Sequence, residues 1–264
     1  MIHNPYLPES SKILLIKKET DLEYTFRLKT KLRCKPGQFF MLSLPKIGEA
    51  PFSPSGISNN WVEFTIRKVG LVSNALFQLK LGEIIYLRGP YGNGFLINDY
   101  ANKNLVIVTG GTGIVPVKPI IDYYYNNSSA VKKINLLFGF KNPSCILFYK
   151  DIKKWRKKFQ SILTVDEACD VSKGERIGLV TKYIKDIELS EINNTEIIII
   201  GPPIMMKYSV SEFLKRVPKE KIIVSFERRM SCGVGKCGHC KINDSYVCTD
   251  GPVYRYSQAE RLID

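Results

Sequence analysis

The feature that most constrains this 264-residue chain is a group of cysteines near its end. Four of the seven cysteines fall between residues 232 and 248, in the spacing C-x4-C-x2-C-x7-C. They are Cys232, Cys237, Cys240 and Cys248, and glycines interleave them at positions 233, 235 and 238. A glycine-rich loop can adopt positive φ and turn several backbone N–H groups toward one centre. The stretch therefore predicts a tight loop that holds a cysteine-ligated inorganic group.

The spacing of the first three cysteines favours an iron–sulfur centre. C-x4-C-x2-C is the spacing with which plant-type ferredoxins bind a [2Fe–2S] cluster through four thiolates. A structural zinc site is an alternative, although such sites usually repeat C-x2-C and this chain has one such pair. Disulfides are a further alternative, which a reducing cytosol disfavours. The other cysteines, Cys34, Cys145 and Cys169, are isolated, and we expect them to be buried small residues.

The composition is that of an ordinary globular protein, with 44% hydrophobic and 24% charged residues. The first residues lack an apolar segment of signal-peptide length, and no apolar run of about eighteen residues predicts a transmembrane helix. We therefore expect a cytoplasmic protein.

The formal charge of +14 suits docking to an acidic partner such as a ferredoxin-like electron carrier, or a surface of solvated lysines. The lysines are scattered without aromatic interleaving, so nucleic acid is not an expected partner.

The N-terminal part of the chain reads as short strands separated by turn signals such as Lys35-Pro36-Gly37. Strands are expected over residues 14–18, 24–28, 39–44, 61–68 and 84–87, with one short helix over 73–78. Short strands at this spacing predict a small antiparallel barrel.

From about residue 104 the pattern alternates between apolar strands and amphipathic helices. Strands are expected over 105–109, 134–138, 161–165, 196–200 and 222–225, and helices around 149–159, 180–187 and 204–216. A further helix is expected directly after Gly113, with Pro116 and Pro119 in its first turn. Alternation of this kind predicts a doubly wound parallel sheet. The expected domains are residues 1–100, 101–225 and 226–264, the last being a small C-terminal iron–sulfur region.

Two glycine-containing turns follow strands of the predicted parallel sheet. The first is Gly110, Gly111, Thr112 and Gly113, and the second is Gly201, Pro202 and Pro203, followed by Ile204, Met205 and Met206. Glycines between a strand and a helix allow a pyrophosphate to approach the backbone at the helix N-terminus, although a plain tight turn has the same pattern. Since ligands lie outside the carboxyl ends of parallel strands, both turns are expected to face one crevice. Met206 is expected in the core of the following helix.

A barrel, a GGTG turn, a GPP-x-MM turn and a four-cysteine loop in this order resemble the ferredoxin–NADP reductase-like superfamily. Within it the chain is similar to the iron–sulfur flavoprotein subunits of dihydroorotate dehydrogenase B and of sulfhydrogenases. Residues 225–240 and 246–253 resemble most closely the iron–sulfur flavoprotein subunits of anaerobic sulfite reductases.

The resemblance implies FAD on the barrel, NADH on the α/β domain, with NADPH as an alternative, and a [2Fe–2S] cluster on the four cysteines. Electrons would pass to a ferredoxin-like subunit and a sirohaem subunit that reduces sulfite to sulfide. The alternatives are the same module serving dihydroorotate dehydrogenase or a hydrogenase, and a zinc-knuckle module that senses nucleotides.

The family binds its flavin at an Arg-x-Tyr-Ser/Thr segment, which Ala50-Pro51-Phe52-Ser53 matches except at Ala50. The resemblance implies that Phe52 packs against the isoalloxazine ring and that Ser53 hydrogen-bonds near its N5. Arg67, in Thr65-Ile66-Arg67, is expected to replace the missing arginine. The turn Gly70-Leu71-Val72-Ser73 resembles the family's pyrophosphate-binding turn. Barrel core for Phe52 and a turn hydroxyl for Ser53 are the alternatives.

The resemblance also places the nicotinamide nucleotide across Gly110–Gly113, beside Pro116, with Gly201–Pro203 and Met205 closing over it. Lys141 alone follows the second strand of this region, and an NADPH site would show a basic cluster there, so NADH is favoured. Cofactors would carry the chemistry, which suits a chain with two histidines.

Overall fold

The computed structural model describes residues 4–168 and 174–262, which form two compact units. The barrel unit comprises the chain up to Phe95 together with Val115–Pro119 and Phe226–Val253. The parallel-sheet unit comprises Leu96–Ile114, Ile120–Ser225 and the chain from Tyr254 on. Cys169 lies outside the described residues.

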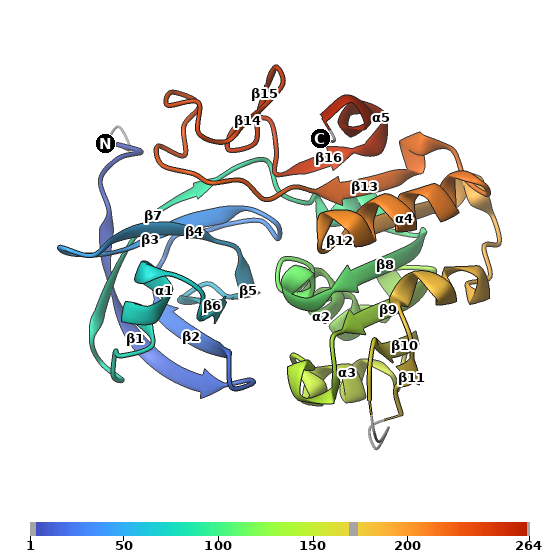
Figure 1. Cartoon of the computed structure of the whole chain (residues 1–264), viewed down its shortest axis with the longest axis horizontal. Helices are drawn as coiled ribbons and strands as arrows, with labels where there is room; N and C mark the ends of the chain where they lie inside the picture. Colours follow the sequence, from blue (N-terminus) through green and yellow to red (C-terminus); the bar gives the residue numbers. More distant parts are fainter. Residues whose placement is uncertain (1–3, 169–173, 263–264) are drawn as a thin grey trace. The chain divides into compact units, whose positions relative to one another are not determined.

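The barrel unit is built on a seven-stranded sheet of order β4-β3-β7-β1-β2-β6-β5 (Figure 1). Its neighbouring strands are antiparallel throughout. The strands are β1 (Glu9–Lys18), β2 (Glu23–Lys29), β3 (Phe39–Leu44), β4 (Gly48–Phe52), β5 (Pro54–Ile57), β6 (Trp61–Arg67) and β7 (Ile84–Tyr91). The short helix α1 covers Leu71–Leu76, two residues earlier than predicted.

Strands β4 and β5 stand at opposite ends of the sheet order, yet Ser53 alone separates them in sequence. The two edges of the sheet must therefore meet at Ser53, and the sheet closes into the predicted barrel. Apolar side chains from alternate positions fill the interior; Phe26 on β2 lies opposite Phe64 on β6, and both are fully buried. Neither β4 nor β5 was predicted, because Pro51 and Pro54 break the strand pattern. Proline is tolerated at the edge of a sheet, where an N–H needs no partner.

The parallel-sheet unit has the strand order β11-β10-β9-β8-β12-β13-β16. Its strands are β8 (Asn104–Gly110), β9 (Lys133–Phe140), β10 (Gln160–Val165), β11 (Arg176–Ile177), β12 (Thr195–Ile200), β13 (Ile222–Ser225) and β16 (Val253–Arg255). From β11 to β13 all neighbours are parallel. Every residue of β8, β12 and β13 is buried, as expected of strands covered on both faces.

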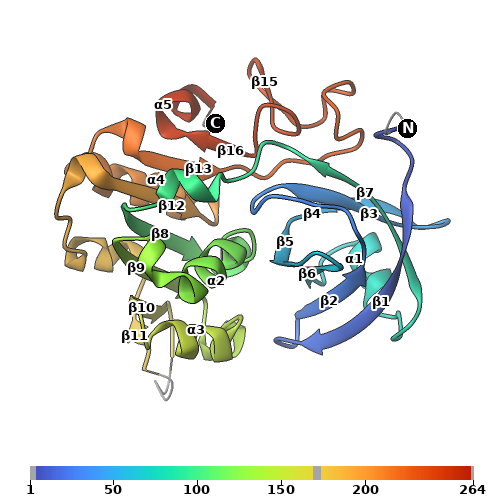
Figure 2. The same cartoon turned by 180° about the vertical axis from the view of Figure 1, so that it is seen from behind.

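Helices cover both faces of this sheet. Helix α4 (Pro203–Leu214) lies in front of it in Figure 1, whereas α2 (Lys118–Asn126) and α3 (Tyr149–Trp155) lie in front in Figure 2. The chain runs from β8 outward to β9 and β10, and then returns to β12 on the other side of β8. The strand order therefore reverses between β8 and β12, which is the position at which doubly wound sheets bind ligands.

Two predicted helices differ from the structure. A 3₁₀ turn over Gly111–Ile114 follows β8, and α2 begins only at Lys118, so Pro119 but not Pro116 lies in its first turn. Residues Val180–Asp186 form a 3₁₀ helix, although an α-helix was predicted.

The C-terminal region contributes to both units. Residues Phe226–Val253 belong to the barrel unit and contain a two-stranded hairpin of β14 (Lys241–Ile242) and β15 (Ser245–Tyr246). From Tyr254 the chain belongs to the parallel-sheet unit, where β16 is the outermost strand and α5 (Tyr256–Ala259) follows. The division into three functional modules at residues 100 and 225 stays a prediction.

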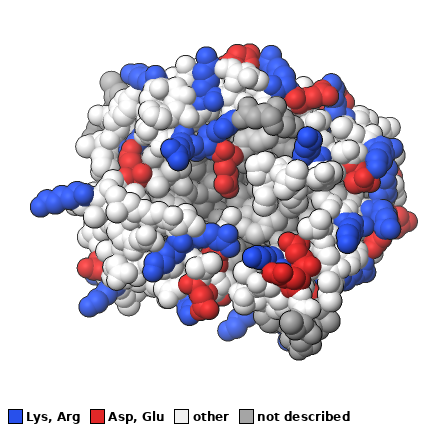
Figure 3. All heavy atoms as spheres, in the orientation of Figure 1, with Lys and Arg blue, Asp and Glu red and all other residues white. Residues whose placement is uncertain are grey.

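Charged side chains are mixed in sign over the face shown in Figure 3, where basic and acidic groups alternate. Several exposed lysines have acidic partners, such as Lys215 with Glu212 and Lys219 with Glu260. Within residues 4–168 and 174–262, none of the helices has the length and hydrophobicity of a membrane span.

Candidate functional site

The loop from Ser231 to Cys248, here called the cluster loop, brings the four predicted cysteine ligands together in two pairs. The thiols of Cys232 and Cys237 lie close enough to shift each other's pKa, and the Cys240 thiol likewise shifts the pKa of Cys248. Cys240 and Cys248 are buried, whereas Cys237 is exposed. Among the described residues, no three such groups meet as ligands of a single ion. The loop therefore presents two thiol pairs side by side.

Backbone N–H groups of the cluster loop point at the sulfur atoms. Val234, Lys236 and Cys237 donate to Cys232 Sγ over 3.4, 3.3 and 3.4 Å, and Gly235 donates to Cys248 Sγ over 3.2 Å. The chain can turn this way because Gly233 and Gly235 have φ of +76° and +73°. Amide donors around sulfur stabilise thiolates, which are the form that binds iron.

The pKa values of the cysteines follow from these contacts. Burial alone would raise the pKa of Cys232, but the N–H groups of Val234, Cys237 and Lys236 bring it below its ordinary value. The backbone N–H of His239, with further contacts from Cys232, lowers the pKa of Cys237 to about 7. Burial and the Cys240 thiol raise the pKa of Cys248 to about 12, so this thiol needs a cation to become a thiolate.

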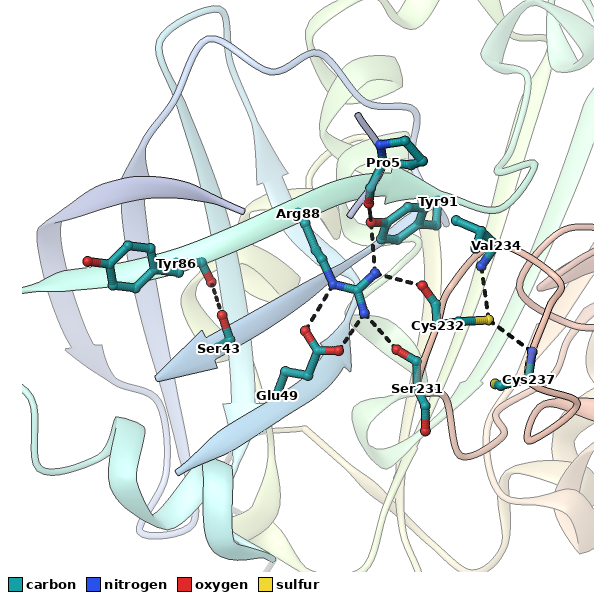
Figure 4. A network of polar contacts seen from close by, with 10 residues as sticks. All are labelled: Pro5, Ser43, Glu49, Tyr86, Arg88, Tyr91, Ser231, Cys232, Val234 and Cys237. Atoms are coloured by element: carbon teal, nitrogen blue, oxygen red, sulfur yellow. Dashed lines mark hydrogen bonds and ion pairs between the residues drawn. The ribbon is translucent and has the colours of Figure 1, made fainter. Parts of the chain in front are cut away.

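Arg88 on β7 fastens the cluster loop to the barrel (Figure 4). Its Nη1 donates to the carbonyl oxygen of Cys232 and its Nη2 to that of Ser231, both over 2.6 Å. Its Nε donates to Glu49 of β4 over 2.9 Å, and its Nη2 also bonds that carboxylate, which makes a bidentate ion pair. Nη1 donates in addition to the hydroxyl of Tyr91 over 2.9 Å.

Nothing in the sequence singled out Arg88. It alternates with Leu87 on β7 and so faces outward from the barrel, where an arginine normally meets solvent. The structure instead leaves its side chain 7% exposed, because residues 231 and 232 cover it. Burial would lower the pKa of Arg88, but Glu49 and Tyr91 raise it, so the guanidinium stays charged. Tyr91 completes the attachment: its hydroxyl donates to the Pro5 carbonyl, and a Cβ on Gly233 would lie 3.1 Å from its ring.

The predicted flavin segment Pro51-Phe52-Ser53 lies at the seam where β4 and β5 close the barrel. All three residues are half-buried, and Phe52 packs against the barrel core opposite Phe40. Thr65 and Ile66 lie on β6, which neighbours β5 in the sheet. The Thr65 hydroxyl is buried between those of Thr25 and Ser55, at 2.8 Å from each, and Ile66 is a core residue.

Arg67 and Ser73 both have protein partners. The Arg67 Nε forms an ion pair with Glu23, whose side chain is 2% exposed. The Ser73 hydroxyl accepts the N–H groups of Val69 and Gly70 over 2.9 Å each and so caps α1. Val72 is half-buried against the barrel core. Contacts of these residues with a flavin stay a prediction.

The two glycine turns of the parallel-sheet unit pack against each other at the carboxyl ends of β8 and β12. A Cβ on Gly113 would lie 2.3 Å from the Ile200 carbonyl oxygen, and one on Gly201 would lie 2.9 Å from the Gly110 nitrogen. A Cβ on Gly110 would meet Met205 Sδ at 2.5 Å. Gly111 differs, because its φ is +54° and a Cβ there would meet open space. Gly111 therefore borders open space, while its neighbours join the two turns.

The remaining predicted residues frame these turns. Thr112 and Pro116 are half-buried, and the exposed Pro202 and Pro203 begin α4. Lys141 follows β9 directly, and its Nζ lies 4.0 Å from Glu167, which follows β10. Of the three isolated cysteines, Cys34 and Cys145 are half-buried where full burial was expected.

Three family models match the chain in succession. They are an oxidoreductase FAD-binding domain over residues 13–95, an oxidoreductase NAD-binding domain over 107–211, and the iron–sulfur cluster binding domain of dihydroorotate dehydrogenase B over 227–260. The third covers the cluster loop. Together with the geometry above, they establish FAD, NAD and an iron–sulfur cluster as the cofactors of this fold.

Relatives align over the whole chain. Sulfhydrogenase 2 subunit gamma of Pyrococcus furiosus is 33% identical over 97% of this chain and 97% of its own length. A probable electron transfer subunit of dihydroorotate dehydrogenase B from the same organism is 33% identical over 88% of this chain and 84% of its own. A solved NADH-dependent reduced ferredoxin–NADP oxidoreductase shares the fold, with a TM-score of 0.77 at 22% identity over 96% of this chain and 89% of its own.

These relatives support the coarse part of the functional prediction and favour its alternative over sulfite reduction. A sulfhydrogenase subunit and a probable dihydroorotate dehydrogenase B subunit align with most of this chain, and the cluster loop matches the dihydroorotate dehydrogenase B iron–sulfur domain. The chain belongs to the ferredoxin reductase-like family of FAD- and NAD-binding oxidoreductase subunits that carry an iron–sulfur domain of the dihydroorotate dehydrogenase B type.

Proposed function

We propose that this chain is the electron-transfer subunit of a larger oxidoreductase, taking electrons from NADH through FAD and a [2Fe–2S] cluster to a partner subunit. The observation that carries the proposal is the cluster loop, with its two thiol pairs, its inward N–H groups and its attachment to the flavin-type barrel.

Each cofactor has a set of residues that would hold it. The seam at Pro51-Phe52-Ser53, with Arg67 and the turn from Gly70 to Ser73, would hold the flavin. The turns at Gly110–Gly113 and Gly201–Pro203, with Met205, would hold the nucleotide. When bound, the flavin accepts a hydride from the nicotinamide and the cluster carries single electrons onward. The chain's own task is to position these groups and to exclude water from Cys240 and Cys248.

The pairing of the thiols supports a two-iron cluster over a single zinc ion. In a [2Fe–2S] cluster each iron takes two protein ligands, so Cys232 with Cys237 and Cys240 with Cys248 would each serve one iron. Zinc would instead need all four ligands around one point.

For the nucleotide we propose a preference for NADH. Lys141 is the basic residue that follows β9, and it lies within 4.0 Å of the Glu167 carboxylate. An NADPH enzyme needs free positive charge for the 2′-phosphate, which a neighbouring carboxylate opposes.

The relatives favour a hydrogenase-type or dihydroorotate dehydrogenase partner. Sulfite reductase is a second candidate, favoured by the cluster-loop sequence around Cys232–Cys240 and Tyr246–Val253. The chemistry of this chain would be the same in each case, and only the docking partner would differ.

The test is anaerobic purification followed by metal analysis and reconstitution. The protein should contain about two irons and two sulfides per chain together with FAD, and should reduce an artificial one-electron acceptor with NADH. Zinc in place of iron would overturn the proposal. Purification of the native complex then separates the partners: hydrogen-, dihydroorotate- or sulfite-dependent turnover should appear with the complex and be absent from the isolated chain.

A further inference from the structure

The ion pair between the buried Arg88 and the partly exposed Glu49 has no part in the chemistry proposed above, yet it touches the cluster loop. We propose that this pair positions the cluster and also sets its reduction potential, Arg88 raising the potential and Glu49 lowering it. The inference rests on the proposed binding of an iron–sulfur cluster by Cys232, Cys237, Cys240 and Cys248.

Arg88 uses its full hydrogen-bonding capacity. A guanidinium has five N–H donors, and five contacts are made here: two to Glu49, one to Tyr91, one to Ser231 and one to Cys232. An ammonium group has three donors and no planar fork, so lysine cannot reproduce this set. The arrangement fixes the backbone of the first cluster cysteine against β7.

The pair is oriented with its positive end toward the cluster loop. The guanidinium lies between the Glu49 carboxylate on one side and the carbonyl groups of Ser231 and Cys232 on the other (Figure 4). The Arg88 side chain is 7% exposed and that of Glu49 33%, so solvent screens Arg88 less. A positive charge next to the cluster stabilises its reduced form, which carries one more electron, and a negative charge does the opposite.

The pair also joins the two cofactor sites of the barrel unit. Glu49 lies on β4, two residues before Pro51 of the predicted flavin segment. Arg88 therefore bonds both the Glu49 carboxylate on β4 and the carbonyl groups of the cluster loop. A displacement of β4 would therefore shift the cluster loop through the Arg88 side chain, and a displacement of the loop would shift β4.

A purely structural clamp and an electrostatic role make different predictions. Loss of a clamp would disturb the loop in the same way whichever partner is removed. An electrostatic role predicts shifts of opposite sign, because removal of Arg88 leaves an uncompensated carboxylate and removal of Glu49 leaves an uncompensated guanidinium.

The experiment is an EPR-monitored redox titration of the purified holoprotein, with iron, sulfide and flavin content measured for each variant. Arg88→Gln should lower the midpoint potential of the cluster and Glu49→Gln should raise it. Each change in the reduction equilibrium should be on the order of tenfold, which is about 59 mV for a one-electron couple. The double variant should return close to the wild-type potential, and Arg88→Lys should keep the potential better than Arg88→Gln but lose part of its iron.

Arg27→Gln is the matched control. Arg27 forms a similar pair with Glu63 on the same barrel, over 2.7 Å, but contacts β6 and not the cluster loop. It should leave the cluster potential and the iron content unchanged.

The outcomes separate this inference from the proposed function. If the purified wild-type protein contained no iron and no sulfide, both the proposed function and this inference would be wrong. A loaded wild type whose Glu49→Gln variant shows an unchanged or lowered potential would overturn the inference alone, as would shifts of the same sign in both single variants. If Arg88→Gln loses its cluster while Arg27→Gln keeps it, the positioning role is supported, and Glu49→Gln alone then decides the electrostatic one.

Discussion

Two glycine-containing loops of this protein are proposed to bind cofactors, and different contacts hold them. The turn Gly110–Gly113 follows the buried strand β8, and a Cβ added at Gly113 would lie only 2.3 Å from the carbonyl oxygen of Ile200, the last residue of β12. The cluster loop has one two-stranded hairpin, β14 and β15, as its regular structure and is held by thiol contacts, inward N–H groups and Arg88. The first is fixed by the surrounding fold, whereas the second depends on ligand chemistry and on one anchoring side chain.

The comparison indicates how each site forms. A turn packed closely against the backbone of a neighbouring strand is complete as soon as its sheet is folded, so a nucleotide bound there would meet a preformed surface. In the cluster loop Ile242 and Val247 are buried, but residues 231–239 are exposed or half-buried apart from Gly233, and a segment of that kind has low local stability of its own. Metal binding then supplies part of the folding free energy of that loop.

The largest expected effect is loss of the cluster in Cys248→Ser. The serine hydroxyl is a poor iron ligand, and Cys248 is buried beside Cys240, where no substitute can approach. Iron content should fall to a small fraction of the wild-type value while FAD is retained. Cys145→Ser is the control, because Cys145 lies outside the cluster loop, and it should keep all its iron. Full iron in Cys248→Ser would show that the loop does not use this ligand.

Next in size is the effect of Gly113→Ala on the free energy of unfolding. The added methyl would overlap the Ile200 carbonyl, so we expect a loss of about 3 kcal/mol, as for a severe case of overpacking. Gly111→Ala is the comparison: it strains a positive φ but meets open space, and should cost about 1 kcal/mol. Chemical denaturation followed by circular dichroism measures both. Equal losses would mean that packing does not fix this turn.

Removal of the cluster by a chelator under anaerobic conditions should separate the two loops directly. Amide hydrogen exchange should accelerate in residues 231–248, because the cluster no longer joins the four thiols. Exchange in residues 105–113 should stay at its holoprotein rate, since β8 is buried in the sheet. If both segments accelerate equally, the cluster stabilises the whole molecule and the contrast between the loops is wrong.

The smallest expected effect belongs to a third loop, the predicted pyrophosphate turn. Ser73→Ala removes the hydroxyl that accepts the Val69 and Gly70 N–H groups, which should cost about 1 kcal/mol of stability. If Ser73 also contacts the flavin, the variant should lose FAD on gel filtration while it is still folded. Asn74→Ala, on the exposed side of α1, is the control for helix stability. If folded Ser73→Ala retained its FAD, Ser73 would cap α1 without contributing to flavin binding.

Much of the fold could be predicted from the sequence because each unit has a local signal. The predicted strands at Leu105–Thr109 and Glu196–Ile200, each with four consecutive apolar residues, lie within β8 and β12, and Ile222–Ser225 is β13. The seam strands β4 and β5 could not be predicted, because their prolines are tolerated only at edges that the tertiary structure creates.

The residues of the site also differ in whether they could be predicted from the sequence. The cysteine spacing and the two glycine turns can be identified from short stretches of sequence. Arg88 does not, because its partners Ser231 and Cys232 follow more than a hundred residues later in the chain. Strand alternation predicts that it faces outward, and only the tertiary structure shows what covers it.

The position of β16 has a consequence for how the protein is made. Arg255 on this strand bonds Glu196, a carboxylate that is 3% exposed and that also pairs with Lys103. A ribosome releases residues 253–255 only after the rest of the parallel sheet, so until then the outer edge of β13 has no neighbour. An unpaired edge of apolar strand can join a second chain. Translation that stalls within the cluster loop would therefore leave an aggregation-prone chain that also lacks some of the cysteines proposed to hold the cluster.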